Sequence, residues 1–99
     1  MFSMAPSYTR LEDFRIHAMN LGIECGNCGH QGIVEGPKIW RWFALHRWNG
    51  ELSKVGEHMR CSVCRRRPTS FAPTPAEPSI DFGPRSEAEW KAAVERLRR

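Results

Sequence analysis

The sequence predicts a small α+β domain in which one metal ion holds two cysteine knuckles together. Three observations support this fold class. All four cysteines lie in two CxxC pairs, about three short segments near the pairs are expected to be strands, and helical patterns occur before, between and after the knuckles. The 99 residues have room for one domain, and a domain this small is commonly stabilised by a metal ion or another staple.

The first helix is expected over about residues 10–19. Thr9 and Glu12 fit a capping box, in which the Thr9 hydroxyl binds an amide of the first turn and Glu12 binds back. Apolar side chains then fall on one helical face: Leu11, Phe14 and Ala18. Short strands are expected on either side of the first cysteine pair, over residues 23–24 and 31–35.

A second helix is expected over about residues 38–48, after the break at Gly36 and with Pro37 in its first turn. Its apolar side chains lie on both sides: Ile39, Trp40, Phe43 and Ala44 on one, Trp42, Leu45 and Trp48 on the other. Such a helix is either buried on most sides, or it offers Trp42 or Trp48 to a partner or a second copy. A short helical turn is expected near Ser53.

The C-terminal third has a different composition. A last strand is expected over residues 69–71, and the proline-rich residues 72–85 read as an extended linker. We therefore divide the chain into a cysteine-bearing domain (1–71), this linker and a C-terminal helix (86–99). Ser86 and Glu89 fit a capping box. The helix carries an apolar stripe, which packs either on the same chain or on a partner: Trp90, Ala93, Val94 and Leu97.

The two CxxC pairs have the chemistry of a structural zinc site. Two CxxC turns supply the four thiolates that tetrahedral zinc prefers, and the 32 residues between them accommodate a helix. The predicted ligands of one zinc ion are Cys25, Cys28, Cys61 and Cys64. Iron accepts the same four ligands and stays open as an alternative. Replacement of a cysteine by His30 or His58, and a thioredoxin-like redox pair, are weaker interpretations.

The motifs CGNCGH and MRCSVC, with a helix between them, resemble those of zinc-ribbon proteins. They are similar in particular to small bacterial zinc-ribbon proteins, mostly of uncharacterised function, and the resemblance spans residues 9–71. It implies a fold and a metal but no defined activity. In such knuckles the residue after the last cysteine is usually glycine, whereas this chain has Arg65, which tolerates a left-handed turn only at some cost.

The remaining patterns argue against an enzyme. A site closed by four cysteines leaves no position for substrate, and no phosphate-binding glycine loop or hydrolase motif is present. No apolar run approaches the ~20 residues of a membrane span. The N-terminal residues lack the features of a secretory signal, so we expect a cytoplasmic protein with reduced cysteines.

The positive charge is concentrated in the cysteine-bearing segment. The chain has a net charge of +4, and residues 25–67 hold eight basic side chains against three acidic ones. The arginines near the ligands either neutralise the zinc–thiolate charge or, with the tryptophans, form a nucleic-acid-binding face. The candidate face comprises Arg41, Arg47, Arg60, Arg65, Arg66, Arg67, Trp42 and Trp48.

Two functions follow from this composition. The first is a small nucleic-acid-binding regulatory protein that uses the basic face. The second is a protein adaptor or inhibitor that docks on a larger partner through its tryptophan-rich helix and C-terminal helix, because tryptophan and arginine are also enriched at protein interfaces. A homodimer is compatible with both functions.

Overall fold

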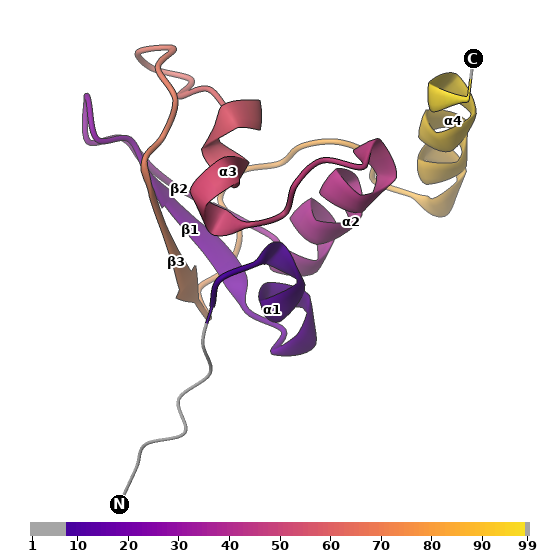
Figure 1. Cartoon of the computed structure of the whole chain (residues 1–99), viewed down its shortest axis with the longest axis horizontal. Coiled ribbons are helices and arrows are strands. Elements are labelled where there is room, and N and C mark those ends of the chain that lie inside the picture. Colours follow the sequence, from indigo (N-terminus) through magenta and orange to yellow (C-terminus); the bar gives the residue numbers. More distant parts are fainter. Residues whose placement is uncertain (1–7, 99) are drawn as a thin grey trace, which may run out of the picture.

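The computed structural model describes residues 8–98 and confirms a mixed α+β domain. The elements are α1 (Leu11–Ile16), β1 (Asn20–Glu24), β2 (Gln31–Val34), α2 (Gly36–His46), α3 (Leu52–Val55), the 3-10 turn η1 (Gly56–His58), β3 (Ser70–Thr74) and α4 (Glu87–Leu97). The three strands form one antiparallel sheet, and α1 and α2 lie on the same side of it (Figure 1). Among residues 8–98, no helix has the length and apolar character required to cross a membrane.

The sheet has the order β2-β1-β3, with β1 in the centre. Its register places Leu21 opposite Val34 and Ile23 opposite Phe71. Because side chains alternate along a strand, these four point to the face that the helices cover. The sheet therefore has one apolar face for the core and one open face.

The core lies between this apolar face and the helices. Its fully or nearly fully buried members are Leu11, Phe14, Leu21, Val34, Ile39, Phe43 and Val55. Burying each such side chain contributes about 1.5–3 kcal/mol. Every helix and strand from α1 to α3 adds at least one of these side chains. Met59, just before the second knuckle, and Phe71 of β3 are partly buried and pack against the cluster.

The start of α1 differs from the prediction by one residue. The Asp13 carboxylate, not that of Glu12, accepts hydrogen bonds from the backbone amides of Thr9 and Arg10, both at 3.0 Å. Glu12 pairs instead with Arg15 on the surface. The helix also ends three residues early, since Ala18 adopts a φ of 52° and turns the chain into β1.

Helix α2 starts earlier than predicted, at Gly36, with Pro37 in its first turn. Gly36 is buried, and a Cβ at this position would collide with the carbonyl oxygen of Met19. The helix ends at His46, before Trp48, because Arg47 adopts a left-handed φ of 57°. The left-handed conformation of Arg47 thus determines where α2 ends. The close approach of the Met19 backbone to Gly36 determines where it begins.

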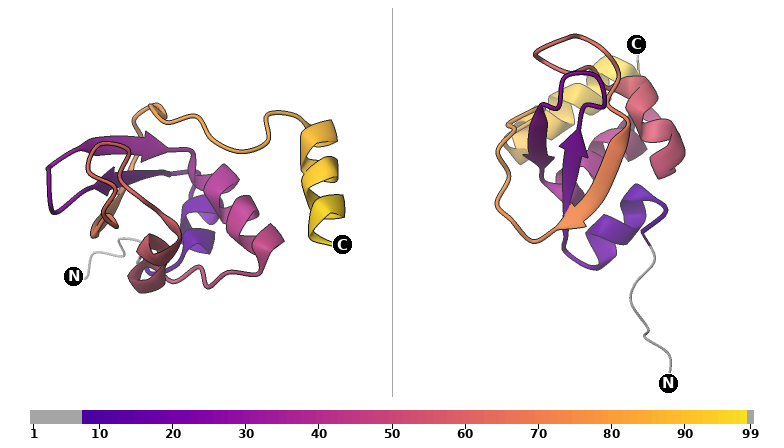
Figure 2. Two further views of the ribbon diagram at one scale, coloured as in Figure 1. Left: turned by 90° about the horizontal axis from the view of Figure 1, so that it is seen from above. Right: turned by 90° about the vertical axis from the view of Figure 1, so that its left-hand side faces the viewer.

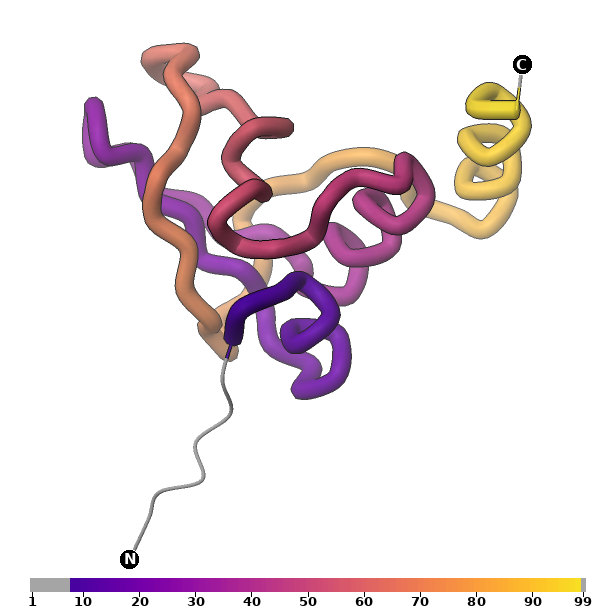
Figure 3. The backbone as a smooth tube through the Cα atoms, viewed as in Figure 1, coloured from indigo at the N-terminus to yellow at the C-terminus, as the bar shows by residue number. Residues whose placement is uncertain are grey.

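The predicted linker is attached to the sheet. We call residues 75–85 the strap; it crosses from β3 to the opposite edge of the sheet, as the backbone trace shows (Figures 2 and 3). There the Ile33 carbonyl accepts hydrogen bonds from the amides of Ser79 and Ile80, at 2.9 and 3.0 Å. The Asn20 side chain donates to the Ala76 carbonyl at 2.8 Å. The strap therefore covers the free edge of β2.

Helix α4 packs on α2 within the same chain. Ser86 caps it as predicted, accepting a hydrogen bond from the Glu89 amide at 3.2 Å. Trp90 is 7% exposed and meets Trp42 edge to face, with ring centroids 6.1 Å apart. The apolar stripe is covered unevenly, since Leu97 at its end is 49% exposed.

Candidate metal centre

The two knuckles are built in the same way from local backbone hydrogen bonds. In the first, which joins β1 to β2, the Gly29 amide donates to the Cys25 carbonyl and the Cys25 amide donates to the His30 carbonyl, both at 2.9 Å. In the second, which leads into β3, the Arg65 and Cys61 amides make the equivalent bonds at 2.9 and 2.8 Å. Each turn thereby brings both sulfurs of its pair to one side.

The left-handed residue of each knuckle follows its second cysteine. Gly29 has a φ of 77° and Arg65 a φ of 68°. The sequence predicted this position for Arg65 from the resemblance to zinc-ribbon knuckles. A left-handed conformation costs a non-glycine residue about 1–2 kcal/mol, so the second knuckle keeps its arginine at an energetic cost.

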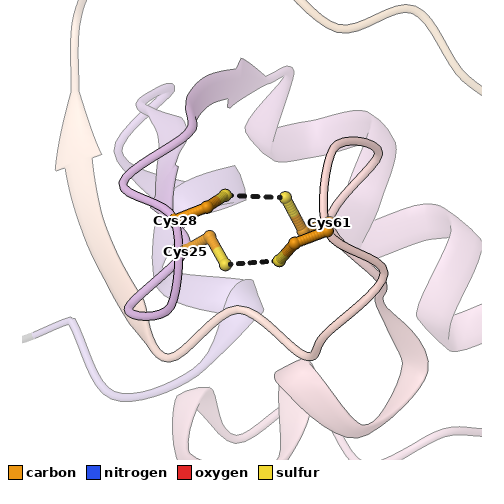
Figure 4. A group of neighbouring side chains, drawn as sticks. Cys25, Cys28 and Cys61 are labelled. Carbon is orange, nitrogen blue, oxygen red and sulfur yellow. Dashed lines mark hydrogen bonds between the residues drawn. The ribbon is translucent and has the colours of Figure 1, made fainter.

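The four cysteine sulfurs lie within 4.8 Å of one another. The Sγ atoms of Cys25 and Cys64 are 3.4 Å apart, and those of Cys28 and Cys61 are 3.6 Å apart (Figure 4). A disulfide requires about 2.05 Å, whereas sulfurs about 2.3 Å from a tetrahedral zinc ion are about 3.8 Å from each other. The spacing therefore fits a bound metal ion.

Hydrogen bonds divide the thiols into easily and poorly ionised members. The backbone amide of Arg66, followed by the Asn27 side chain, lowers the pKa of Cys64 to about 6. The His30 amide also favours the Cys28 thiolate, but desolvation and the three neighbouring thiols outweigh it and raise the pKa of Cys28 to about 12. Four neighbouring thiols therefore do not all ionise easily, because each thiolate would lie next to the others. A bound cation would stabilise all four thiolates and so favour their deprotonation.

The two candidate histidines lie outside the sulfur cluster. The His30 ring is exposed, with its Nε2 atom 3.5 Å from the Ser62 hydroxyl. The His58 ring stacks on Trp48 with centroids 4.0 Å apart and an interplanar angle of 8°. His46 stacks on Trp48 as well, at 4.2 Å. Trp48 therefore belongs to an internal aromatic stack, which the sequence pattern did not indicate.

Four of the predicted binding residues gather beside the second knuckle. These are Arg60, Arg65, Arg66 and Arg67, which we call the arginine patch. All four are exposed, and they surround a shallow hollow of about 620 Å³ together with Gly26, Asn27 and Thr69. Within residues 8–98, none of the four forms an ion pair with a carboxylate.

The other four predicted residues lie elsewhere. The Arg41 guanidinium donates two hydrogen bonds to the Glu87 carboxylate, at 2.8 and 2.9 Å, and lies 4.3 Å from the centre of the Trp90 ring. Arg47 borders a separate hollow between α2 and α4. Trp42 is half-buried between Phe82 and Trp90. Arg41 and Trp42 thus contact α4 and the strap, Trp48 lies in the aromatic stack, and none of the four lines the hollow of the arginine patch.

A cavity of about 310 Å³, which the sequence did not predict, lies behind the second knuckle. Its aromatic walls come from α2, the loop after it and the strap: Trp42, Phe43, Trp48 and Phe82. Cys25 and Cys61 border it on the metal side. In the sequence, the aromatic residues on both faces of the predicted second helix were the feature that could have indicated this cavity. They were interpreted as a sign of either burial or an interface.

The sulfur cluster agrees with the zinc-ribbon-like site that the resemblance implied. The arrangement of helices and strands around it is that of a small α+β domain. In comparisons with known proteins, no family model, no curated protein and no solved structure matches the chain.

Proposed function

We propose that the chain is a non-catalytic zinc-binding module whose arginine patch binds nucleic acid. The observation that carries the proposal is the grouping of four exposed guanidinium groups beside the second knuckle, with no carboxylate partner in the described chain. Guanidinium groups bind phosphates through several donors at once.

The choice of zinc rests on the donor set. Four thiolates in a tetrahedral arrangement form the usual structural zinc site, in which no coordination position stays open for water or substrate. Iron accepts the same donors and is separated from zinc by metal analysis. A closed site gives the ion a structural role, and we therefore propose no catalytic activity.

Charge supports the nucleic-acid interpretation. One zinc ion with four thiolates carries a net charge of −2, and part of the arginine charge offsets it. Four guanidinium groups exceed that requirement. The surplus is exposed around a hollow rather than paired with acidic side chains, and a phosphate backbone is a suitable counterpart.

The alternative function, a protein adaptor, has less support. It relied on the surplus tryptophans of the second helix and on the tethered C-terminal helix as docking elements. Trp42 and Trp90 pack against each other, and Arg41 binds Glu87, so these side chains are engaged within the chain. A homodimer is compatible with either function.

Fluorescence anisotropy at low salt tests the proposal with labelled duplex and single-stranded oligonucleotides. We expect binding that weakens steeply as salt rises, because phosphate contacts release counterions. The triple variant Arg65→Ala, Arg66→Ala and Arg67→Ala should bind at least tenfold more weakly.

A matched triple variant on α4 serves as the control: Lys91→Ala, Arg96→Ala and Arg98→Ala, all at exposed positions. It removes the same charge at a distance from the patch and should retain most of the affinity. The absence of binding to duplex and single strands at low salt would refute the proposed function, and an equal loss in both triples would refute the assignment to the patch.

A further inference from the structure

We infer that the cavity behind the second knuckle receives one unpaired base of the nucleic acid whose phosphates contact the arginine patch. The preferred ligand is then a single strand. This inference rests on the proposed function and adds a ligand class to it.

The cavity walls suit a flat aromatic ring. Trp42 and Phe82 line it with partly exposed rings, and every nucleobase stacks on such rings irrespective of its sequence. Phe43 is buried and Trp48 is stacked by His46 and His58, so these two complete the wall without offering a stacking face. The volume of about 310 Å³ is at the low end of ligand pockets, which span about 300–1,000 Å³. It therefore suits one ring system better than a larger ligand.

The cavity and the arginine patch share a residue. Arg60 borders both the cavity and the hollow that the patch surrounds. A nucleotide with its base in the cavity can therefore place its phosphate near Arg60, and the adjoining phosphates can follow the patch. Continuity between an aromatic cavity and a cationic track is the general design of single-strand binding sites.

The charge of the cavity agrees with this occupant. Its titratable lining groups, apart from the cysteines, are His30, His58 and Arg60, and no carboxylate lines it in the described part of the chain. The cysteine cluster is thus the one negative centre that borders the cavity in the described part of the chain, and the other lining groups offer no counter-charge to a cationic ligand. The His30 ring and the Ser62 hydroxyl, 3.5 Å apart at the knuckle, offer donors and acceptors to the edge of a base.

A duplex is a poor occupant for a physical reason. Its bases are stacked and paired, and moving one of them into a concave site costs the stacking and pairing energy of that base. An unpaired strand avoids that cost while presenting the same phosphates.

The first test compares four ligands of equal length by anisotropy: oligothymidylate, oligouridylate, an abasic strand and a duplex. Base stacking contributes about 1–3 kcal/mol per base, so the abasic strand and the duplex should bind at least fivefold more weakly than the base-bearing strands. The thymidylate and uridylate arms separate DNA from RNA. Equal binding of the abasic strand would overturn the inference but leave the proposed function intact, whereas no binding to any ligand refutes the proposed function itself.

The second test locates the base through tryptophan fluorescence. The chain has four tryptophans. The variant Trp40→Phe with Trp90→Phe keeps only the two that line the cavity, and stacking of a base should quench its emission. The reciprocal variant, Trp42→Phe with Trp48→Phe, should show little quenching. Quenching confined to the reciprocal variant would place the base elsewhere. If the variant with Trp42→Phe and Trp48→Phe fails to fold, the variant with Trp40→Phe and Trp90→Phe is used alone. Saturable binding to it without quenching of its emission overturns the inference.

Discussion

Gly29 and Arg65 occupy the same position in the two knuckles. Each follows the second cysteine of its pair, each has a left-handed φ, and each donates its amide to the carbonyl of the first cysteine at 2.9 Å. Glycine adopts this conformation without strain and arginine does not. The strained residue lies in the arginine patch, and local strain of this kind is often retained at binding sites.

Replacing Arg65 by glycine should stabilise the protein and weaken nucleic-acid binding. Relief of the left-handed conformation gains about 1–2 kcal/mol, and the greater freedom of glycine in the unfolded chain takes back about 0.5–1 kcal/mol. The expected net gain in unfolding free energy is roughly 0.5–1 kcal/mol. Urea denaturation of the zinc-loaded protein measures it, and anisotropy measures the binding.

Arg47 provides the matched control, since it is also left-handed, with a φ of 57°, and also exposed. Arg47→Gly removes the same charge at the end of α2, where glycine is favoured. It should stabilise the fold similarly and leave binding nearly unchanged. A loss of stability in Arg65→Gly, or an equal loss of affinity in both variants, would contradict this account.

Removal of the metal should unfold the domain. Structural zinc contributes about 10 kcal/mol or more in small domains, which is as large as the typical unfolding free energy of a whole domain, about 5–15 kcal/mol. Metal analysis should find one zinc ion per chain. Circular dichroism should then lose the folded signal after chelation and in Cys61→Ser. The neighbouring variant Ser62→Ala should bind zinc normally, and a metal-free protein that stays folded would rule out the zinc site.

Truncation of Trp90 should release α4 without disturbing the knuckles. Trp→Ala in a core costs about 3–5 kcal/mol, and an isolated helix of the length of α4 is marginal in water. Limited trypsin digestion of Trp90→Ala should therefore cleave within α4 while zinc content stays at one per chain. Leu97→Ala, at a half-exposed position, should resist trypsin like the parent. Resistance of Trp90→Ala itself would show that α4 is held by other contacts.

Asp13 should stabilise the start of α1 through its charge. The backbone amide of Thr9, followed by that of Arg10, lowers the pKa of Asp13 below its ordinary value. Since the folded-state pKa is depressed, its stabilisation is complete above the unfolded-state pKa and disappears as the pH falls through the folded-state value. At pH 7, Asp13→Ala should cost about 0.5–1 kcal/mol in urea denaturation.

Glu12→Ala is the control for Asp13, because Glu12 forms only a surface pair with Arg15, and such pairs contribute little. Its effect should be smaller than that of Asp13→Ala. The reverse order would show that the capping box predicted from the sequence, with Glu12 in it, describes the protein in solution. Carboxyl NMR of Asp13 offers a direct measurement of the lowered pKa.

The sequence was informative where the determinants are local. Ser86 and Glu89 predicted the start of α4, and the strands beside the first knuckle were placed to within three residues. The cysteine spacing predicted the sulfur cluster because a CxxC turn is itself a local structure. The start of α1 was misplaced by one residue, since Glu12 and Asp13 are both acidic and only the backbone path selects between them.

The parts that the sequence did not predict depend on long-range contacts. Ser79 is hydrogen-bonded to Ile33, and Arg41 to Glu87, and the two residues of each pair are 46 positions apart in the sequence. No periodic pattern in the sequence encodes such pairs. The Trp48 stack and the cavity arise where α2, its following loop and the strap converge. For the same reason the composition suggested one basic face, whereas the chain path separates Arg41 and Arg47 from the arginine patch.

The position of the second knuckle has a consequence for strand register. Ser70 begins β3 six residues after Cys64, and Phe71 is the one aromatic side chain that this strand turns toward the core, opposite Ile23. A slip by one residue would turn it to the open face, and β3 has little else to prevent this. A metal ion that joins Cys61 and Cys64 to the β1–β2 turn would fix where β3 begins to pair. The ion would thereby set the register of β3 against β1.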